Sequence, residues 1–173
     1  AQYLSKAGIT GRGSISFFKR LQTMEYRYGY TRNADSEFYS THPVTSDRIT
    51  TLEDTYQADP AWSRPPDPAI EERFQRVKAK LVGYVSEPQR TLQLYPVTVN
   101  TVPARYARAY AFHKDAQLDK AMAEVDALLA AAPADPYFLE LKGQILLEAG
   151  KPRDALAPLR RATELTANQP LIA

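Results

Sequence analysis

Residues 103–166 read PARYARAYAFHKDAQLDKAMAEVDALLAAAPADPYFLELKGQILLEAGKPRDALAPLRRATELT. This stretch contains two copies of one pattern, because a shift of 34 residues superimposes five pairs of apolar or small positions. The pairs are Ala109 with Gly143, Phe112 with Leu146, Ala121 with Ala155, Val125 with Leu159, and Leu128 with Ala162. Small residues let the two helices of a hairpin approach closely, while large ones fill the groove against the next hairpin. The stretch therefore predicts two helical hairpins.

The four helices of these hairpins are expected at residues 103–114, 118–131, 136–149 and 152–166. Gly150 closes the third helix and Pro152 opens the fourth. The order of a small residue, a large residue, an alanine and a final proline resembles the tetratricopeptide repeat, with Pro133 at the proline site. This resemblance implies a concave surface that binds peptides or protein partners, formed by residues 103–173. Two repeats are fewer than the three or so needed for independent stability, so we expect the array to pack against another part of the protein.

The segment before the repeats, residues 57–102, reads as a linker with one helix at about residues 67–83. Asp67 is a capping residue and Pro68 suits the first helical position. The apolar side of this helix repeats at helical spacing, through Ile70, Phe74, Val77 and Leu81. Its charged residues, which include Arg73, Arg76 and Lys80, are expected on a solvated face. Residues 91–95 alternate briefly and predict a short extended segment.

The N-terminal segment is expected to hold a helix end and a second helix. Residues 1–8 read as the last turns of a helix closed by Gly8, and residues 14–22 have amphipathic spacing. Gly11 and Gly13 are interpreted as a turn between helices, because no strand precedes them as a phosphate-binding loop would require. So short a first helix is marginal by itself, and we expect the chain to be a fragment or a processed product.

Residues 41–49, Thr-His-Pro-Val-Thr-Ser-Asp-Arg-Ile, hold one of the two histidines of the chain. Pro43 restricts His42 to extended backbone, which holds the imidazole on a stiff loop. Thr45 or Ser46 can cap a following helix, whose buried side would include Ile49 and Leu52. Arg48 would then lie near a helix N-terminus, where a cation is disfavoured unless it has an anionic partner. We expect either a carboxylate partner from outside this chain or a solvated arginine.

These features in order resemble the C-terminal part of a bacterial zinc metallopeptidase of the CAAX-prenyl-protease-like group. The resemblance rests on Ala7-Gly8, the helix with Phe17-Phe18-Lys19-Arg20-Leu21, Ser40-Thr41-His42-Pro43 with Arg48-Ile49, and the repeats. It implies an all-α chain in which residues 1–56 are the C-terminal end of the metallopeptidase domain. Members of the group bind zinc through His-Glu-x-x-His, and this sequence has no such motif. The resemblance thus implies a periplasmic or cell-envelope zinc endopeptidase of protein quality control as the parent. The chain alone is expected to be inactive and to bind no zinc.

Within such a parent, His42 and Arg48 are expected to be accessory to the active site. One hypothesis gives His42 the open fourth position of the zinc ion as a regulatory ligand, and another gives it contact with substrate. The plain alternative is a histidine that braces its loop. Arg48 would pair with an acidic residue near the metal and orient it. His113 has no companion at ligand spacing and is interpreted as an exposed polar residue.

Composition excludes several other classes. The net charge of +2 comes from 22 basic and 20 acidic residues spread along the chain, so no nucleic-acid footprint is expected. Cysteine is absent, and no window approaches the roughly 18 to 20 apolar residues of a transmembrane helix. An independent enzyme is disfavoured, since neither a nucleophilic cysteine nor a paired-carboxylate site is evident. The rival to the protease fragment is a stand-alone tetratricopeptide adaptor whose N-terminal helices cap the repeats.

Overall fold

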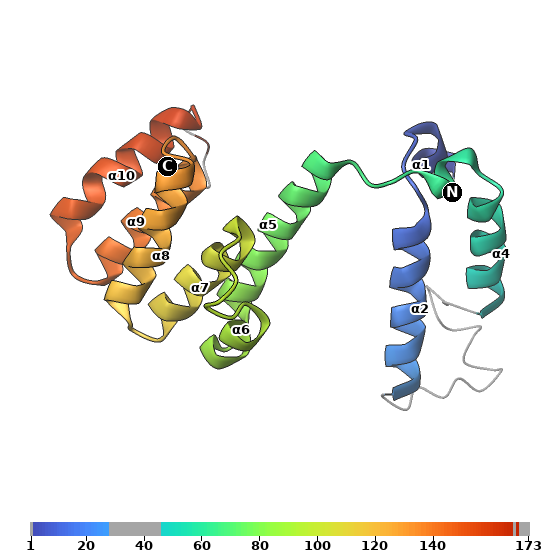
Figure 1. Cartoon of the computed structure of the whole chain (residues 1–173), viewed down its shortest axis with the longest axis horizontal. Helices are drawn as coiled ribbons and strands as arrows, with labels where there is room; N and C mark the ends of the chain where they lie inside the picture. The colour runs from blue at the N-terminus through green and yellow to red at the C-terminus, as the bar shows by residue number, and fades with distance from the viewer. Residues whose placement is uncertain (1, 28–45, 168, 170–173) are drawn as a thin grey trace. The chain divides into compact units, whose positions relative to one another are not determined.

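The computed structural model describes residues 2–27, 46–167 and 169, and these form helices with short connections (Figure 1). The described part of the chain contains nine α-helices and one 3-10 helix and no strand. The all-α class predicted from the sequence is confirmed. The chain divides into two compact units, residues 1–68 and 69–173.

The first unit contains α1 (Gln2–Lys6), α2 (Arg12–Arg27), α4 (Ser46–Gln57) and the 3-10 helix η1 (Pro60–Ser63). Gly8, with φ of +68°, ends α1 as predicted. The core of this first unit includes Ile15 and Ile49, which confirms that Ile49 lies on the buried side of α4. A Cβ at Gly11 would overlap the buried Tyr56 ring. Gly11 therefore permits a close approach inside the unit, as expected for a turn between helices.

The second unit contains α5 (Pro68–Val85), α6 (Pro88–Leu94), α7 (Val102–Lys114), α8 (Leu118–Ala131), α9 (Pro136–Glu148) and α10 (Pro152–Leu165). The bounds of α7 to α10 agree with the predicted helices to within one residue at each end. The pairs α7 with α8 and α9 with α10 are the two helical hairpins (Figure 1). Their core joins Tyr106, Val125, Leu128, Phe138 and Ile145.

The small positions of the repeat are used for close helix approach. A Cβ at Gly143 would overlap the Leu159 side chain, so α9 and α10 touch at this point. Ala121 and Ala155, which the 34-residue shift aligns, are both buried. The pairing of small with large residues inferred from the sequence is therefore the packing within the hairpins.

A buried arginine fastens residues 96–99 to the repeats. The Arg108 side chain on α7 is 1% exposed, and its Nε lies 2.6 Å from Oε1 of Glu124 on α8. Its Nη1 donates to the carbonyl oxygens of Pro96 and Val99 at 2.9 and 2.7 Å. The segment before α7 is therefore held by polar contacts to one buried guanidinium.

The prediction of an extended segment at residues 91–95 is wrong, because these residues belong to or follow α6. Pro88 stands in the first turn of that helix, a position that proline favours. Thr91 is fully buried and Leu92 packs against the core of the repeats. Tertiary packing here outweighs a five-residue alternation, which is too short to distinguish a strand from a helix.

Helices α5, α7 and α9 begin 34 residues apart, at Pro68, Val102 and Pro136. After α7 and α9 the chain turns back at residues with positive φ, Ala116 and Gly150. The corresponding position of α5 is Val82, and a β-branched residue strongly disfavours that conformation. Helix α5 therefore continues to Val85 and does not form a hairpin like those of the repeats.

Helix α5 packs on α7 through small residues. Ala79 and Gly83, one turn apart, are buried, and a Cβ at Gly83 would lie 2.8 Å from the carbonyl oxygen of Ala107. Lys114 Nζ also donates to the carbonyl oxygens of Tyr84 and Ser86, at 3.0 and 2.8 Å. The helix predicted inside the linker is thus attached to the repeats.

Candidate functional site

Of the two predicted site residues, the structure describes Arg48. His42 lies outside the described residues. Arg48 is exposed in the first turn of α4, and it has interactions with its surroundings. The roles proposed for these two residues stay predictions.

No metal site is evident in the described residues. Among them, no three His, Cys, Asp or Glu side chains lie together in a group that could hold a metal ion. Zinc in proteins needs three or four such ligands around one point. The described residues therefore do not by themselves supply the donor set of a zinc site.

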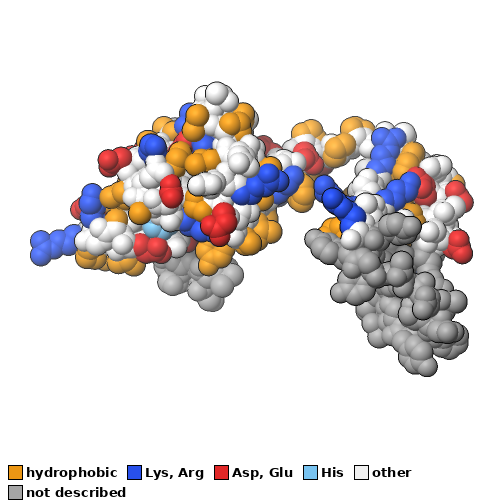
Figure 2. Space-filling model, turned by 90° about the horizontal axis from the view of Figure 1, so that it is seen from below, with side chains coloured by type: hydrophobic (Ala, Val, Ile, Leu, Met, Phe, Trp, Pro, Cys, Tyr) orange, Lys and Arg blue, Asp and Glu red, His pale blue; other side chains and the backbone are white. Residues whose placement is uncertain are grey.

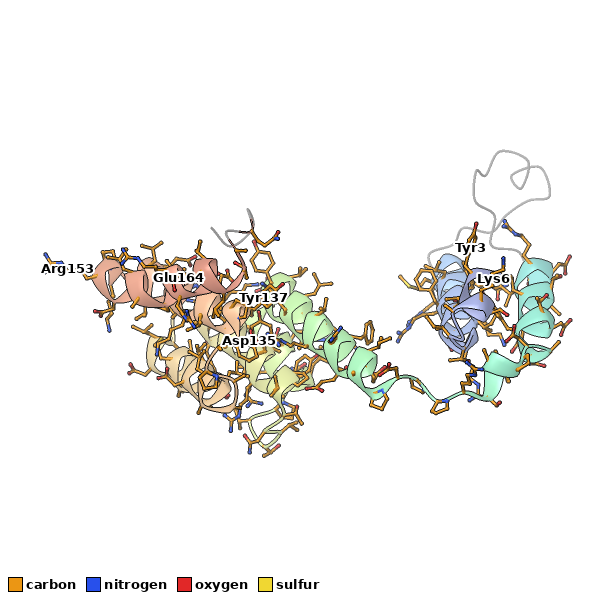
Figure 3. The ribbon with its side chains drawn as sticks, turned by 90° about the horizontal axis from the view of Figure 1, so that it is seen from above. Tyr3, Lys6, Asp135, Tyr137, Arg153 and Glu164 are labelled. Atoms are coloured by element: carbon orange, nitrogen blue, oxygen red, sulfur yellow. The ribbon has the colours of Figure 1, made fainter. Side chains whose placement is uncertain are left out.

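One hollow of the second unit lies where α5 meets the first helix of each repeat. It is a pocket of about 450 Å³. Its lining residues are Arg73, Arg76, Val77 and Lys80 of α5, Tyr106 of α7 and Tyr137 of α9. Figure 3 labels Tyr137 and Asp135 at the side of α9 that adjoins α5. The lining combines three basic residues with two aromatic rings and contains no acidic residue.

Arg76 forms one wall of the pocket and joins α5 to α9. Its Nη2 lies 2.6 Å from both carboxylate oxygens of Asp135. The guanidinium carbon stands 4.2 Å from the centre of the Phe138 ring, a cation–π distance. Asp135 also caps α9, since its side chain accepts from the backbone of Tyr137 and Phe138. Both charges of this pair are therefore satisfied inside the protein.

Tyr106 is a second, unusual member of the lining. The residue is 1% exposed, and its hydroxyl is buried without a hydrogen-bond partner in the described structure. Burial, reinforced by the neighbouring Tyr110, raises the pKa of Tyr106 well above its usual range. The hydroxyl thus stays protonated, and Tyr110 is the neighbouring side chain that it faces. A buried donor without a partner is costly, and such groups call for an explanation.

The other two basic residues are less constrained. Lys80 Nζ lies 3.6 Å from Oε2 of Glu140, longer than a hydrogen bond, and 5.6 Å from the centre of the Tyr137 ring. Arg73 is exposed and forms no ion pair with the described residues. The pocket therefore has positive charge that its own surroundings do not fully neutralise.

His113 is placed differently from its prediction as an exposed polar residue, which is wrong. Its side chain is 16% exposed, and Nε2 lies 2.7 Å from Oε2 of Glu148. This contact joins the end of α7 to the end of α9. The helical repeat spacing aligns His113 with Leu147, next to Glu148, so the repeat itself could have indicated a contact between the two helices.

The sequence did not identify the pocket. Its basic residues were interpreted as a solvated face of α5, which is wrong for Arg76. One feature of the sequence could have indicated this contact, the capping residue Asp135. An N-cap aspartate is an anion with which a nearby cation such as Arg76 can pair. Nothing in the spacing of residues 73–80 indicates which helix they would meet.

Comparisons of the chain with protein-family models, with curated proteins and with solved structures gave no match. A function therefore has to be inferred from the residues of the chain and their geometry. Among the helices that the structure describes, none is long and apolar enough to cross a membrane.

Proposed function

We propose that residues 69–173 form a protein-binding module built on two tetratricopeptide-like hairpins. The observation that supports this proposal most directly is the pocket between α5, α7 and α9, with its basic and aromatic lining. Helical hairpin arrays of this kind bind partners through surfaces formed by successive helices. The module holds a peptide or protein segment and carries out no chemistry of its own.

The test is a selection of peptides that bind the complete chain from a random displayed library. We expect enriched peptides that share a pattern and bind saturably when synthesised. Enrichment no greater than that on an unrelated helical protein would overturn the proposal.

The resemblance noted in the sequence supports a narrower proposal. In it, the chain is the non-catalytic C-terminal portion of a zinc-dependent endopeptidase of the bacterial cell envelope, in the periplasm, where it acts in protein quality control. The module then recruits a substrate or an assembly partner for the missing protease domain. Zinc belongs to that parent, and His42 and Arg48 are accessory to its active site.

The alternative is a stand-alone adaptor without a protease domain. The coding sequence upstream discriminates the two. An in-frame His-Glu-x-x-His within roughly a hundred residues supports the protease, in keeping with the helical metal motif of such enzymes, and a start codon or signal peptide directly before Ala1 supports the adaptor. His42→Ala in the full-length enzyme tests the two hypotheses for this residue, zinc ligation and substrate contact. Unchanged proteolysis and unchanged zinc affinity would contradict both.

A further inference from the structure

Helix α5 has a second face that the repeats do not cover. Six large apolar residues follow one another at helical spacing along it, and each is between 56% and 66% exposed. They are Ile70, Phe74, Val77, Leu81, Tyr84 and Val85, and we call them the α5 stripe. Ala79 and Gly83, which pack on α7, lie on the opposite side of the helix, because a residue advances about 100° around the axis.

The α5 stripe and the basic pocket form one continuous surface. Val77 belongs to both, and Arg73 and Lys80 follow the edge of the stripe on the pocket side. In Figure 2, hydrophobic and basic side chains lie next to one another over the second unit. An apolar strip of this length, rimmed by charged residues, is typical of an interaction site.

We propose that this surface binds an amphipathic helix with acidic residues along one edge, supplied by a partner protein. The proposal rests on the function proposed above and names the class of partner. The stripe spans residues 70–85, about 22 Å of helix at 1.5 Å per residue, which matches a partner helix of about four turns. Apolar residues of the partner at i, i+3, i+4 and i+7 cover the stripe.

Charge complementarity selects an acidic partner. Arg73 and Lys80 stand at the pocket edge, and Arg73 has no ion pair among the described residues. A partner carboxylate at the pocket edge receives hydrogen bonds from Arg73, which is exposed. A second copy of this chain fits less well. An antiparallel pairing of two α5 helices would bring their two basic edges side by side, and the like charges would repel.

The test uses the complete chain and a designed probe. The probe is an 18-residue amphipathic peptide with leucines on one face and glutamates along its edges, and its counterpart carries lysines in place of the glutamates. We expect the glutamate peptide to bind at least about tenfold more tightly at low salt, in line with electrostatic complementarity at interfaces. Equal binding of the two peptides would overturn the proposal.

Two variants of the surface and two matched controls locate the binding. Arg73→Glu and Val77→Asp are each expected to weaken binding of the glutamate peptide by at least about tenfold. Arg160→Glu and Leu156→Asp place the same changes on exposed residues of α10 and should leave binding within about twofold. Both surface variants replace exposed residues, and far-ultraviolet circular dichroism is the check that they fold. Equal loss in the control variants would contradict the placement.

A photo-crosslinking residue at position 74, in place of Phe74, identifies the occupant. With the glutamate peptide present, we expect the crosslink to form to the peptide. A crosslink to residues 1–67 of the same chain, or to a second copy, would overturn the proposal. These outcomes are distinct from a failure of the proposed function, which fails only if no peptide of any sequence binds the chain. Binding of peptides elsewhere on the module would contradict the present inference alone.

Discussion

Arg76 and Asp135, 59 residues apart in sequence, are joined by contacts of 2.6 Å between Nη2 of the guanidinium and both carboxylate oxygens. The pair fixes α5 to the first turn of α9, and it stands at the wall of the basic pocket. It is partly buried, with side chains 28% and 13% exposed. Hydrogen bonds between charged groups in partly buried surroundings contribute more to the free energy of unfolding than ion pairs at the open surface do.

A double-mutant cycle with Arg76→Ala and Asp135→Asn measures this pair. Asparagine keeps the N-cap of α9 while it removes the charge. We expect a coupling free energy of about 1–3 kcal/mol from urea unfolding. The control cycle is Lys19→Ala with Glu53→Gln in the first unit, an exposed pair at 2.6 Å, for which about 0.2–1 kcal/mol is expected. A coupling for Arg76 no larger than this control would show that the pair does not fasten α5.

The buried pair of Arg108 and Glu124 should be the most sensitive polar contact of the module. Arg108→Ala leaves Glu124 paired only with Arg105, whose Nη1 lies 3.0 Å from Oε2, and it frees the carbonyl oxygens of Pro96 and Val99. Because several hydrogen bonds to one charged group are lost together, we expect a loss of about 2–4 kcal/mol in the free energy of unfolding. Circular dichroism during urea unfolding measures it, and fluorescence of Trp62, the single tryptophan, reports on the first unit in the same samples.

The control for Arg108→Ala is Arg161→Ala, which removes an exposed pair with Glu164 on α10. Its effect should stay below about 1 kcal/mol. If Arg108→Ala were as mild, the buried guanidinium would contribute little to holding residues 96–99.

The helices of the repeats were predictable because local and tertiary signals agree there. Pro136, Gly150 and Pro152 mark helix ends, and the small residues at repeat spacing are the ones that the hairpins bury. Agreement of this kind between levels is what lets a sequence indicate its fold. Helix α6 was missed because its seven residues are too few for a period, and its place depends on Leu92 packing against the repeats.

The pocket could not be predicted for a different reason. Arg73, Arg76 and Lys80 look alike in sequence, as basic residues of an amphipathic helix. Only the docking of α5 decides that Arg76 meets Asp135 while Arg73 stays exposed. That docking follows from Ala79 and Gly83, whose small size was visible, but the helix that they would meet was not.

Gly143 tests whether the contact of α9 with α10 is as close as the repeat pattern requires. A Cβ there would overlap the Leu159 side chain, so Gly143→Ala overfills the hairpin. We expect a destabilisation of about 1–3 kcal/mol in urea unfolding. Gly13→Ala is the control, since nothing lies within 4 Å of its added methyl group in α2. It should stabilise by about 0.5–1 kcal/mol through helix propensity alone. A stabilising Gly143→Ala would contradict the close approach.

Glu148 gives the module a dependence on pH in the acid range. A hydrogen bond from Gln144 lowers the pKa of Glu148, and His113 lowers this pKa further against the opposing effect of burial. A carboxyl whose pKa is lower in the folded state favours folding above its unfolded pKa, and this stabilisation is lost as the pH falls through the folded pKa. The ordinary pKa of glutamate is about 4.3, so the loss should begin near that pH and continue below it.

The measurement compares the free energy of unfolding of the wild-type chain and Glu148→Gln between about pH 6 and pH 2, a range that covers the carboxyl titration. We expect the advantage of the wild type to shrink steadily below about pH 4.5 and to vanish at the acid end. Gln144→Ala removes the hydrogen bond that is the main cause of the lowered Glu148 pKa. It should therefore reduce the pH dependence of stability more than His113→Asn does. The explanation would be rejected if the advantage of the wild type grew toward low pH, because that sign requires a raised pKa, or if Gln144→Ala left the dependence unchanged.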